Sequence, residues 1–132
     1  MLRGSCLCGA VTYEVQGAPI VMYYCHCGTC RKATGTAFAT NMIVPTDDFR
    51  VVSGRDVLSS FESSPQKRCY FCSRCASPIY SQAEQTKSMV SVRCGTLDDA
   101  PGVQPSVHTW VADRAPWFEI RDDLPQKPGS IA

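Results

Sequence analysis

The sequence contains no long hydrophobic run and carries almost no net charge. No apolar stretch approaches the roughly 20 residues that a transmembrane helix needs, and the first residues lack the apolar core of a signal peptide. The formal net charge is +1, and the longest basic runs are the pairs at 31–32 and 67–68. We therefore expect a cytoplasmic protein that binds neither nucleic acid nor a membrane.

Histidine is also scarce, whereas cysteine is abundant. Two histidines, His26 and His108, accompany nine cysteines. An odd number of cysteines without a secretory signal favours metal ligands or catalytic thiols over a disulfide framework. The 132 residues suffice to bury a hydrophobic core. They predict a single domain over residues 1–132, with an extended and weakly ordered tail from about residue 122.

No segment shows a long helical period, whereas short segments rich in β-forming residues alternate with turn signals. This pattern predicts a mainly β fold of the sandwich or barrel-like type, with little helix. One helical turn is expected over 31–35, closed by Gly35, and a break in the chain is expected at Ser77 and Pro78. The extended or strand-like segments are 5–15, 20–24, 37–44, 49–52, 57–62, 67–71, 89–94, 107–111 and 117–120.

Two of the cysteine groups come in pairs. In an extended segment residues i and i+2 point to the same side, so Cys6 and Cys8 can bind one ion together. The Cys-x-x-Cys turn of Cys72 and Cys75 can do the same. Two such pairs predict a closed, tetrahedral four-cysteine site of the structural zinc type. The alternative is that these four residues are unrelated buried thiols.

The third group supplies three thiols from one short loop, at Cys25, Cys27 and Cys30. Three protein ligands and an open fourth position are typical of a catalytic zinc. Other readings are a disulfide or a second structural site. The candidates to complete such a site are Cys94, Cys69, His108 and His26, the last disfavoured because it alternates with two ligands.

Several motifs recur in one order along the chain. They are GSCLCGAV at 4–11, CHCGTCRKATG at 25–35, FCSRCASPIY at 71–80, GTLDD at 95–99, HTW at 108–110 and PWFEI at 116–120. With these motifs the chain resembles the glutathione-dependent formaldehyde-activating enzyme (GFA) family, also known as the centromere-protein-V/GFA-type domain. The resemblance implies a β-tent fold of several short antiparallel sheets stapled by zinc. It also implies a structural zinc on Cys6, Cys8, Cys72 and Cys75, and a more labile catalytic zinc on Cys25, Cys27 and Cys30.

The resemblance further implies carbon–sulfur bond formation between glutathione and formaldehyde. We therefore expect a zinc-dependent carbon–sulfur lyase or adduct-forming enzyme that acts on a small thiol and an aldehyde. A non-catalytic zinc-binding module for protein interaction and a thiol-rich metal or redox buffer are the alternatives.

Four residues outside the cysteine groups carry open interpretations. Arg31 and Lys32 either attract substrate carboxylates or are solvated surface charges. His108 either shuttles a proton or is structural. Ala76 stands where the family usually has glycine, so it is strained if that position needs a positive φ.

Overall fold

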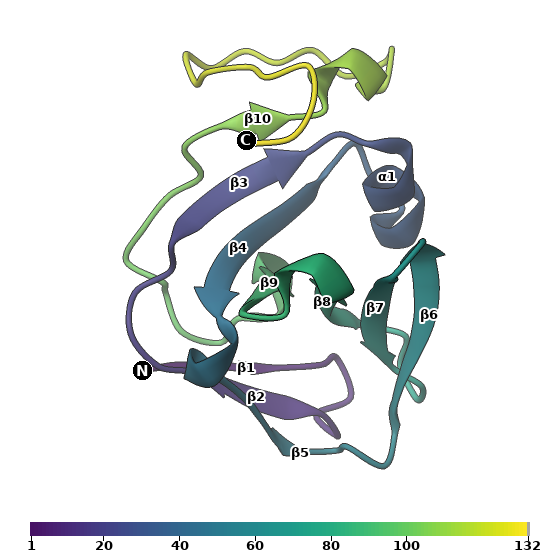
Figure 1. Cartoon of the computed structure of the whole chain (residues 1–132), viewed down its shortest axis with the longest axis vertical. Coiled ribbons are helices and arrows are strands. Elements are labelled where there is room, and N and C mark those ends of the chain that lie inside the picture. The colour runs from purple at the N-terminus through teal and green to yellow at the C-terminus, as the bar shows by residue number, and fades with distance from the viewer. Residues whose placement is uncertain (132) are drawn as a thin grey trace.

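The computed structural model describes residues 1–131, which form two β-sheets and one α-helix (Figure 1). The smaller sheet has the strand order β1-β2-β5, and the larger has the order β10-β3-β4-β9-β8-β7-β6. This mainly β architecture confirms the expected fold class. The strands are β1 (Leu2–Ser5), β2 (Thr12–Val15), β3 (Val21–Cys25), β4 (Ala39–Pro45), β5 (Phe49–Ser53), β6 (Leu58–Ser64), β7 (Lys67–Cys72), β8 (Pro78–Ala83), β9 (Met89–Arg93) and β10 (His108–Thr109).

The helical elements are short. Helix α1 spans Gly28–Thr34, and four 3-10 turns span Thr46–Asp48, Glu84–Thr86, Cys94–Thr96 and Val111–Asp113. Within residues 1–131, no helix combines the length and the apolar character that crossing a membrane requires.

The hydrophobic core lies between the two sheets. Valine and tyrosine side chains of the small sheet meet aliphatic side chains on one face of the large sheet. Alternation along β4 shows the consequence: Met42 and Val44 enter this core, whereas Asn41 is buried on the opposite face. The core contains Val11, Tyr13, Val15, Met42, Val44, Val51, Ile79, Val90 and Val92.

The structure contradicts one chain break and one strand that the sequence predicted. Strand β8 begins at Pro78, where a break was expected, because proline is tolerated as the first residue of a strand. Residues 117–120 form no strand, and the ring of Phe118 packs against the rings of Phe38 and His26. The expected strand 107–111 shortens to His108–Thr109.

The helical turn expected at 31–35 is part of a longer helix. α1 begins at Gly28, three residues earlier than expected, and it ends as predicted at Gly35, which has a φ of 71°. A left-handed residue at this position is the usual helix end, and glycine adopts it without strain.

The C-terminal segment is hydrogen-bonded to β10, although the sequence predicts a weakly ordered tail. The His108 amide donates to the Pro125 carbonyl at 2.9 Å, and the Lys127 amide donates to the His108 carbonyl at 2.9 Å. The Trp110 amide donates to the carbonyl of Gly129 at 2.8 Å. Since β10 pairs in parallel with β3, the tail supports the strand that ends at Cys25 (Figure 1).

Candidate metal centres

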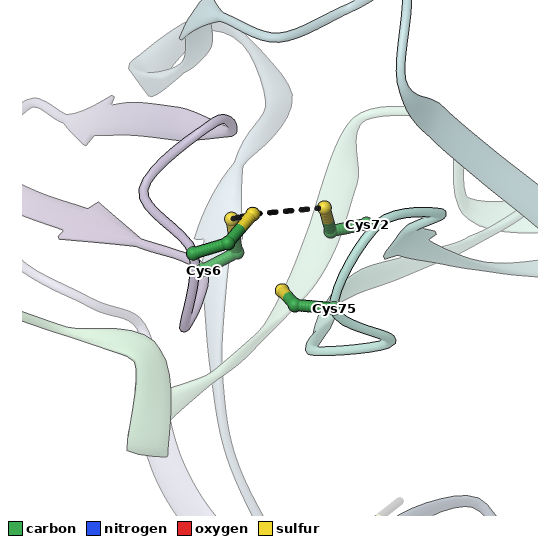
Figure 2. Close-up of side chains that lie close together, drawn as sticks. Cys6, Cys72 and Cys75 are labelled. Atoms are coloured by element: carbon green, nitrogen blue, oxygen red, sulfur yellow. Dashed lines mark hydrogen bonds between the residues drawn. The ribbon is translucent and has the colours of Figure 1, made fainter.

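The first group of thiols joins two loops that lie far apart in the sequence. Cys6 and Cys8 lie between β1 and β2, Cys72 ends β7, and Cys75 lies in the turn before β8. Figure 2 shows the sulfurs of Cys6, Cys72 and Cys75 turned toward one another. The Cys6 and Cys8 sulfurs are 3.6 Å apart, and those of Cys8 and Cys72 are 3.8 Å apart. All four sulfur atoms lie within 4.8 Å of one another.

These distances fit a single zinc ion. Sulfur atoms at the corners of a tetrahedron around zinc, each about 2.3 Å from the metal, are about 3.8 Å apart. All nine cysteines of the chain are free thiols, so no disulfide competes for these sulfurs within residues 1–131. The structure thus brings together the four residues that the sequence grouped as one closed site.

Local hydrogen bonds prepare this group for a cation. The Val11 amide donates to the Cys6 sulfur at 3.2 Å. Hydrogen bonding to the side chain and backbone of Ser77 lowers the pKa of Cys75 to about 5. Both effects stabilise thiolates, which are the form that binds zinc.

The turn between Cys72 and β8 contains a strained residue. Ala76 has a φ of 66°, and its amide donates to the Cys72 carbonyl at 2.7 Å. An L-residue in this left-handed conformation is strained by contact between its Cβ and the backbone. The glycine expected here from the family pattern would adopt it freely.

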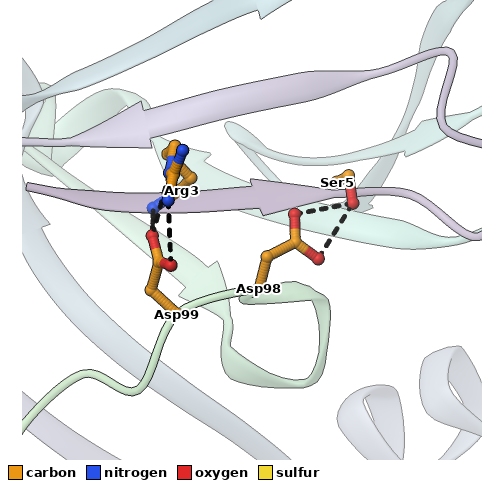
Figure 3. A network of polar contacts seen from close by, with 4 residues as sticks. All are labelled: Arg3, Ser5, Asp98 and Asp99. Atoms are coloured by element: carbon orange, nitrogen blue, oxygen red, sulfur yellow. Dashed lines mark hydrogen bonds and ion pairs between the residues drawn. The ribbon is translucent and has the colours of Figure 1, made fainter.

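The GTLDD motif at 95–99 binds the strand that leads into Cys6 through an ion pair and hydrogen bonds. The Arg3 guanidinium pairs with Asp99, at 3.2 Å between Nε and Oδ2 (Figure 3). The Ser5 hydroxyl donates to the Asp98 carboxylate at 2.8 Å. The motif therefore has a structural role in positioning β1 beside the four-cysteine group.

The second group is built at the junction of β3 and α1. Cys25 is the last residue of β3, and Cys27 caps α1 by accepting a hydrogen bond from the Cys30 amide at 3.3 Å. Cys30 lies in the first turn of the helix. The sulfurs of Cys25 and Cys27 are 3.4 Å apart, and all three sulfurs lie within 4.8 Å of one another. We call this group the trio.

No further cysteine, histidine, aspartate or glutamate within residues 1–131 joins the trio. The Cys94 sulfur lies 3.8 Å from the Val92 carbonyl and packs beside the main core. Cys69 lines a cavity that the trio also lines, but it is not one of the grouped candidate ligands. The arrangement supplies three sulfur ligands on one side of an ion and none on the other.

The thiols of the trio share protons unequally. Hydrogen bonds with Cys25 and then Cys30, together with a smaller effect of the Lys67 charge, lower the pKa of Cys27 to about 2. The same hydrogen bond raises the pKa of Cys25. Cys27 is therefore the thiol that ionises first in the metal-free loop.

The trio opens onto a cavity of about 930 Å³. This volume lies within the usual range for small-molecule sites. Three cationic side chains, Arg31, Lys67 and Arg93, line the cavity, whereas Asp113 is the only carboxylate among the lining residues. The Nε atom of Arg31 is buried without a hydrogen-bond partner. Lys32, the other basic candidate, is not among the lining residues.

The two histidines lie behind the loop. His26 is fully buried, and its Nε2 lies 2.8 Å from Nδ1 of His108, whose Nε2 is 2.9 Å from the Asp122 carboxylate. Burial lowers the pKa of His26 to about 4. His26 thus points away from the sulfurs, as strand alternation predicts. His108 does not line the cavity, which favours its structural interpretation.

Sequence reasoning missed Arg93. It is a lone arginine at the end of a strand, and no local motif distinguishes it. The structure places its guanidinium beside Cys30, 63 residues away along the chain. The available signal in the sequence was that Arg93 continues an alternating strand, so that one charged residue shares a strand with buried side chains.

Comparison with known proteins supports a family assignment. The family model described as "Glutathione-dependent formaldehyde-activating enzyme" matches residues 1–113. A Halomonas elongata protein, named "Putative glutathione-dependent formaldehyde-activating enzyme", is 33% identical over 129 residues, covering 91% of this chain and 81% of its own. A crystal structure of a Rhodobacter sphaeroides protein superposes with a TM-score of 0.63 at 26% identity, covering 78% of this chain and 91% of its own.

Proposed function

The chain belongs to the glutathione-dependent formaldehyde-activating enzyme family, and on this premise we propose that it joins a small thiol to an aldehyde. The thiol is glutathione-like and the aldehyde is formaldehyde or a close relative. A bond forms between the thiol sulfur and the carbonyl carbon, and the thiol proton ends on the carbonyl oxygen. In the reverse direction the same enzyme is a carbon–sulfur lyase. The supporting observation is a three-thiol group that faces a cavity. A separate group of four thiols supplies all the ligands of a tetrahedral site.

Zinc is the metal we propose for both groups. Thiolate ligands select zinc over magnesium or calcium, and the sulfur spacings suit its bond lengths. Cys6, Cys8, Cys72 and Cys75 would hold a structural ion, and Cys25, Cys27 and Cys30 would hold the catalytic one. When bound by the trio, zinc supplies a Lewis acid at the cavity wall.

The remaining groups of the cavity select and orient the thiol substrate. Arg31 and Lys67 take part in none of the ion pairs within residues 1–131. Their charges can therefore attract substrate carboxylates. Glutathione-like thiols carry such carboxylates. Holding the thiol and the aldehyde within one cavity converts a bimolecular addition into an effectively intramolecular one.

The test is adduct formation from glutathione and formaldehyde. We expect zinc-loaded protein to exceed the spontaneous rate, and Cys27→Ala to lower the rate by at least about 100-fold because it breaks the trio. Cys94→Ala is the matched control, because that thiol lies outside both groups, and it should retain activity. Protein that binds two zinc ions and gives only the spontaneous rate, with these and with other thiols and aldehydes, would contradict the proposal.

A non-catalytic zinc-binding module is the second candidate. Leu7 and Trp117, whose side chains are 87% and 70% exposed, are apolar contacts that such a module would offer to another protein. Metal retention separates the two candidates. One tight and one labile zinc ion support the enzyme, whereas two equally tight ions support the module.

We also propose that the protein works in the cytoplasm. Nine free thiols, seven of them grouped as candidate ligands, remain reduced in such a compartment. The assignment is tested by labelling the protein, separating the cell fractions and measuring whether the label lies in the cytoplasmic fraction.

A further inference from the structure

The large sheet contains a buried arginine, Arg93, that pairs with no carboxylate within residues 1–131. The Arg93 side chain is 7% exposed, and it lies on the cavity face of β9. None of the ion pairs formed within residues 1–131 includes Arg93. Burying an unpaired charge is strongly unfavourable, so a partner of opposite charge is required.

Two contacts fix the Arg93 guanidinium in place. Its Nη1 atom donates to Asn41 Oδ1 at 2.9 Å and lies 3.8 Å from the Cys30 sulfur. The Asn41 amide donates to the Tyr23 hydroxyl at 3.4 Å, and that hydroxyl lies 3.1 Å from Ser91 Oγ. Asn41 is neutral, so it orients the guanidinium without balancing its charge.

The remaining partner is the trio itself. Three thiolates around one divalent ion carry a net charge of about −1. One adjacent guanidinium compensates that charge, and the trio in turn compensates the buried guanidinium.

We propose that Arg93 is a positioning residue whose guanidinium is the fixed counter-charge of the metal-binding trio, acting through Cys30. All three cysteines bind a metal as thiolates, so the metal-bound trio is anionic and a buried cation beside it favours the metal-bound form. Arg93 touches a ligand and not the reacting atoms. This inference rests on the proposed function, because it assumes that the trio binds a metal.

The experiment measures the zinc affinity of each site by competition with a chromophoric chelator. Partners beyond the ligands typically change metal affinity by about 10- to 100-fold. We expect Arg93→Met to weaken the trio's affinity within that range and to leave the four-cysteine site unchanged. Arg93→Lys keeps the charge and should recover most of the loss. Arg68→Met removes an exposed arginine from the same sheet and should change neither site.

The variant Asn41→Ser keeps the charge but removes its orientation, and it serves if Arg93→Met does not fold. We expect it to weaken the trio's affinity several-fold. Unchanged affinity in both Arg93→Met and Asn41→Ser overturns the inference, including the case where only the KM of the thiol rises. Equal losses in Arg93→Met and Arg93→Lys also overturn it, because packing alone would then explain them.

The outcomes for the inference and for the proposed function remain distinct. A wild-type protein that binds a single zinc ion refutes the proposed catalytic centre. A wild-type protein that binds two zinc ions, and whose trio does not respond to Arg93, refutes only this inference.

Discussion

The left-handed residue in the turn after Cys75 gives a quantitative prediction. Ala76→Gly removes the Cβ that strains this position at a φ of 66°. The left-handed conformation costs an L-residue about 1–2 kcal/mol in the folded state. Glycine costs about 0.4–1 kcal/mol through the larger entropy of the unfolded chain. The substitution should therefore stabilise the protein by about 1 kcal/mol.

The expected shift in melting temperature follows from chain length. An unfolding entropy of about 2.1 cal/mol/K per residue gives about 0.28 kcal/mol/K for 132 residues. A gain of about 1 kcal/mol then raises Tm by about 4 °C. Urea unfolding at fixed free zinc measures the same gain, because a fixed zinc concentration keeps the contribution of metal binding the same in both proteins.

The matched control reverses the change at another turn. Gly35 has a φ of 71°, and no atom lies within 4 Å of where its Cβ would be. Gly35→Ala thus adds the same strain without a clash, and it should lower stability by about 1 kcal/mol. If Gly35→Ala destabilises while Ala76→Gly has no effect or also destabilises, Ala76 stores no strain and the reasoning is refuted.

Three further predictions concern the metal, the backbone and pH. Cys72→Ser should lower the zinc content by one ion and stability by more than about 4 kcal/mol; an unchanged zinc content by mass spectrometry would exclude Cys72 as a ligand. Gly54→Ala should lower the free energy of unfolding in urea by at least about 2 kcal/mol, because Gly54 has a φ of 85° and an added Cβ would lie 2.3 Å from the Ala10 carbonyl oxygen. Wild-type stability of this variant would contradict the packing. His26 has a pKa of about 4 when folded and about 6.5 when unfolded, so the unfolded chain binds more protons and stability falls as pH falls from about 6.5 to 4. By pH 5 the loss is about 2 kcal/mol, and an equal loss in His26→Gln would assign it to other groups.

The grouping of the candidate metal ligands was predictable because their geometry is local. A Cys-x-Cys segment and a Cys-x-x-Cys turn each fix two sulfurs through their own backbone, and a closed site requires two such pairs. The sequence therefore separates Cys6, Cys8, Cys72 and Cys75 from the trio. The helix end expected at Gly35 was equally local, and the structure confirms it.

Features that depend on distant partners were not predictable. Strand β8 exists because β7 and β9 pair with its two edges, although its proline start resembles a break. The residues 125–129 are polar and rich in proline, and their order comes from hydrogen bonds with the backbone of 108–111. Arg93 meets Cys30 only after β9 and α1 have been brought together.

The order of the ligands along the chain has a consequence for synthesis. The trio is complete once residue 30 has left the ribosome, whereas the four-cysteine group waits for residue 75. With the zinc assignment proposed above, the growing chain offers the metal its three-thiol loop first and its four-thiol group later. We expect that zinc captured early by the trio must be passed on, or replenished, for both sites to fill when the metal is scarce.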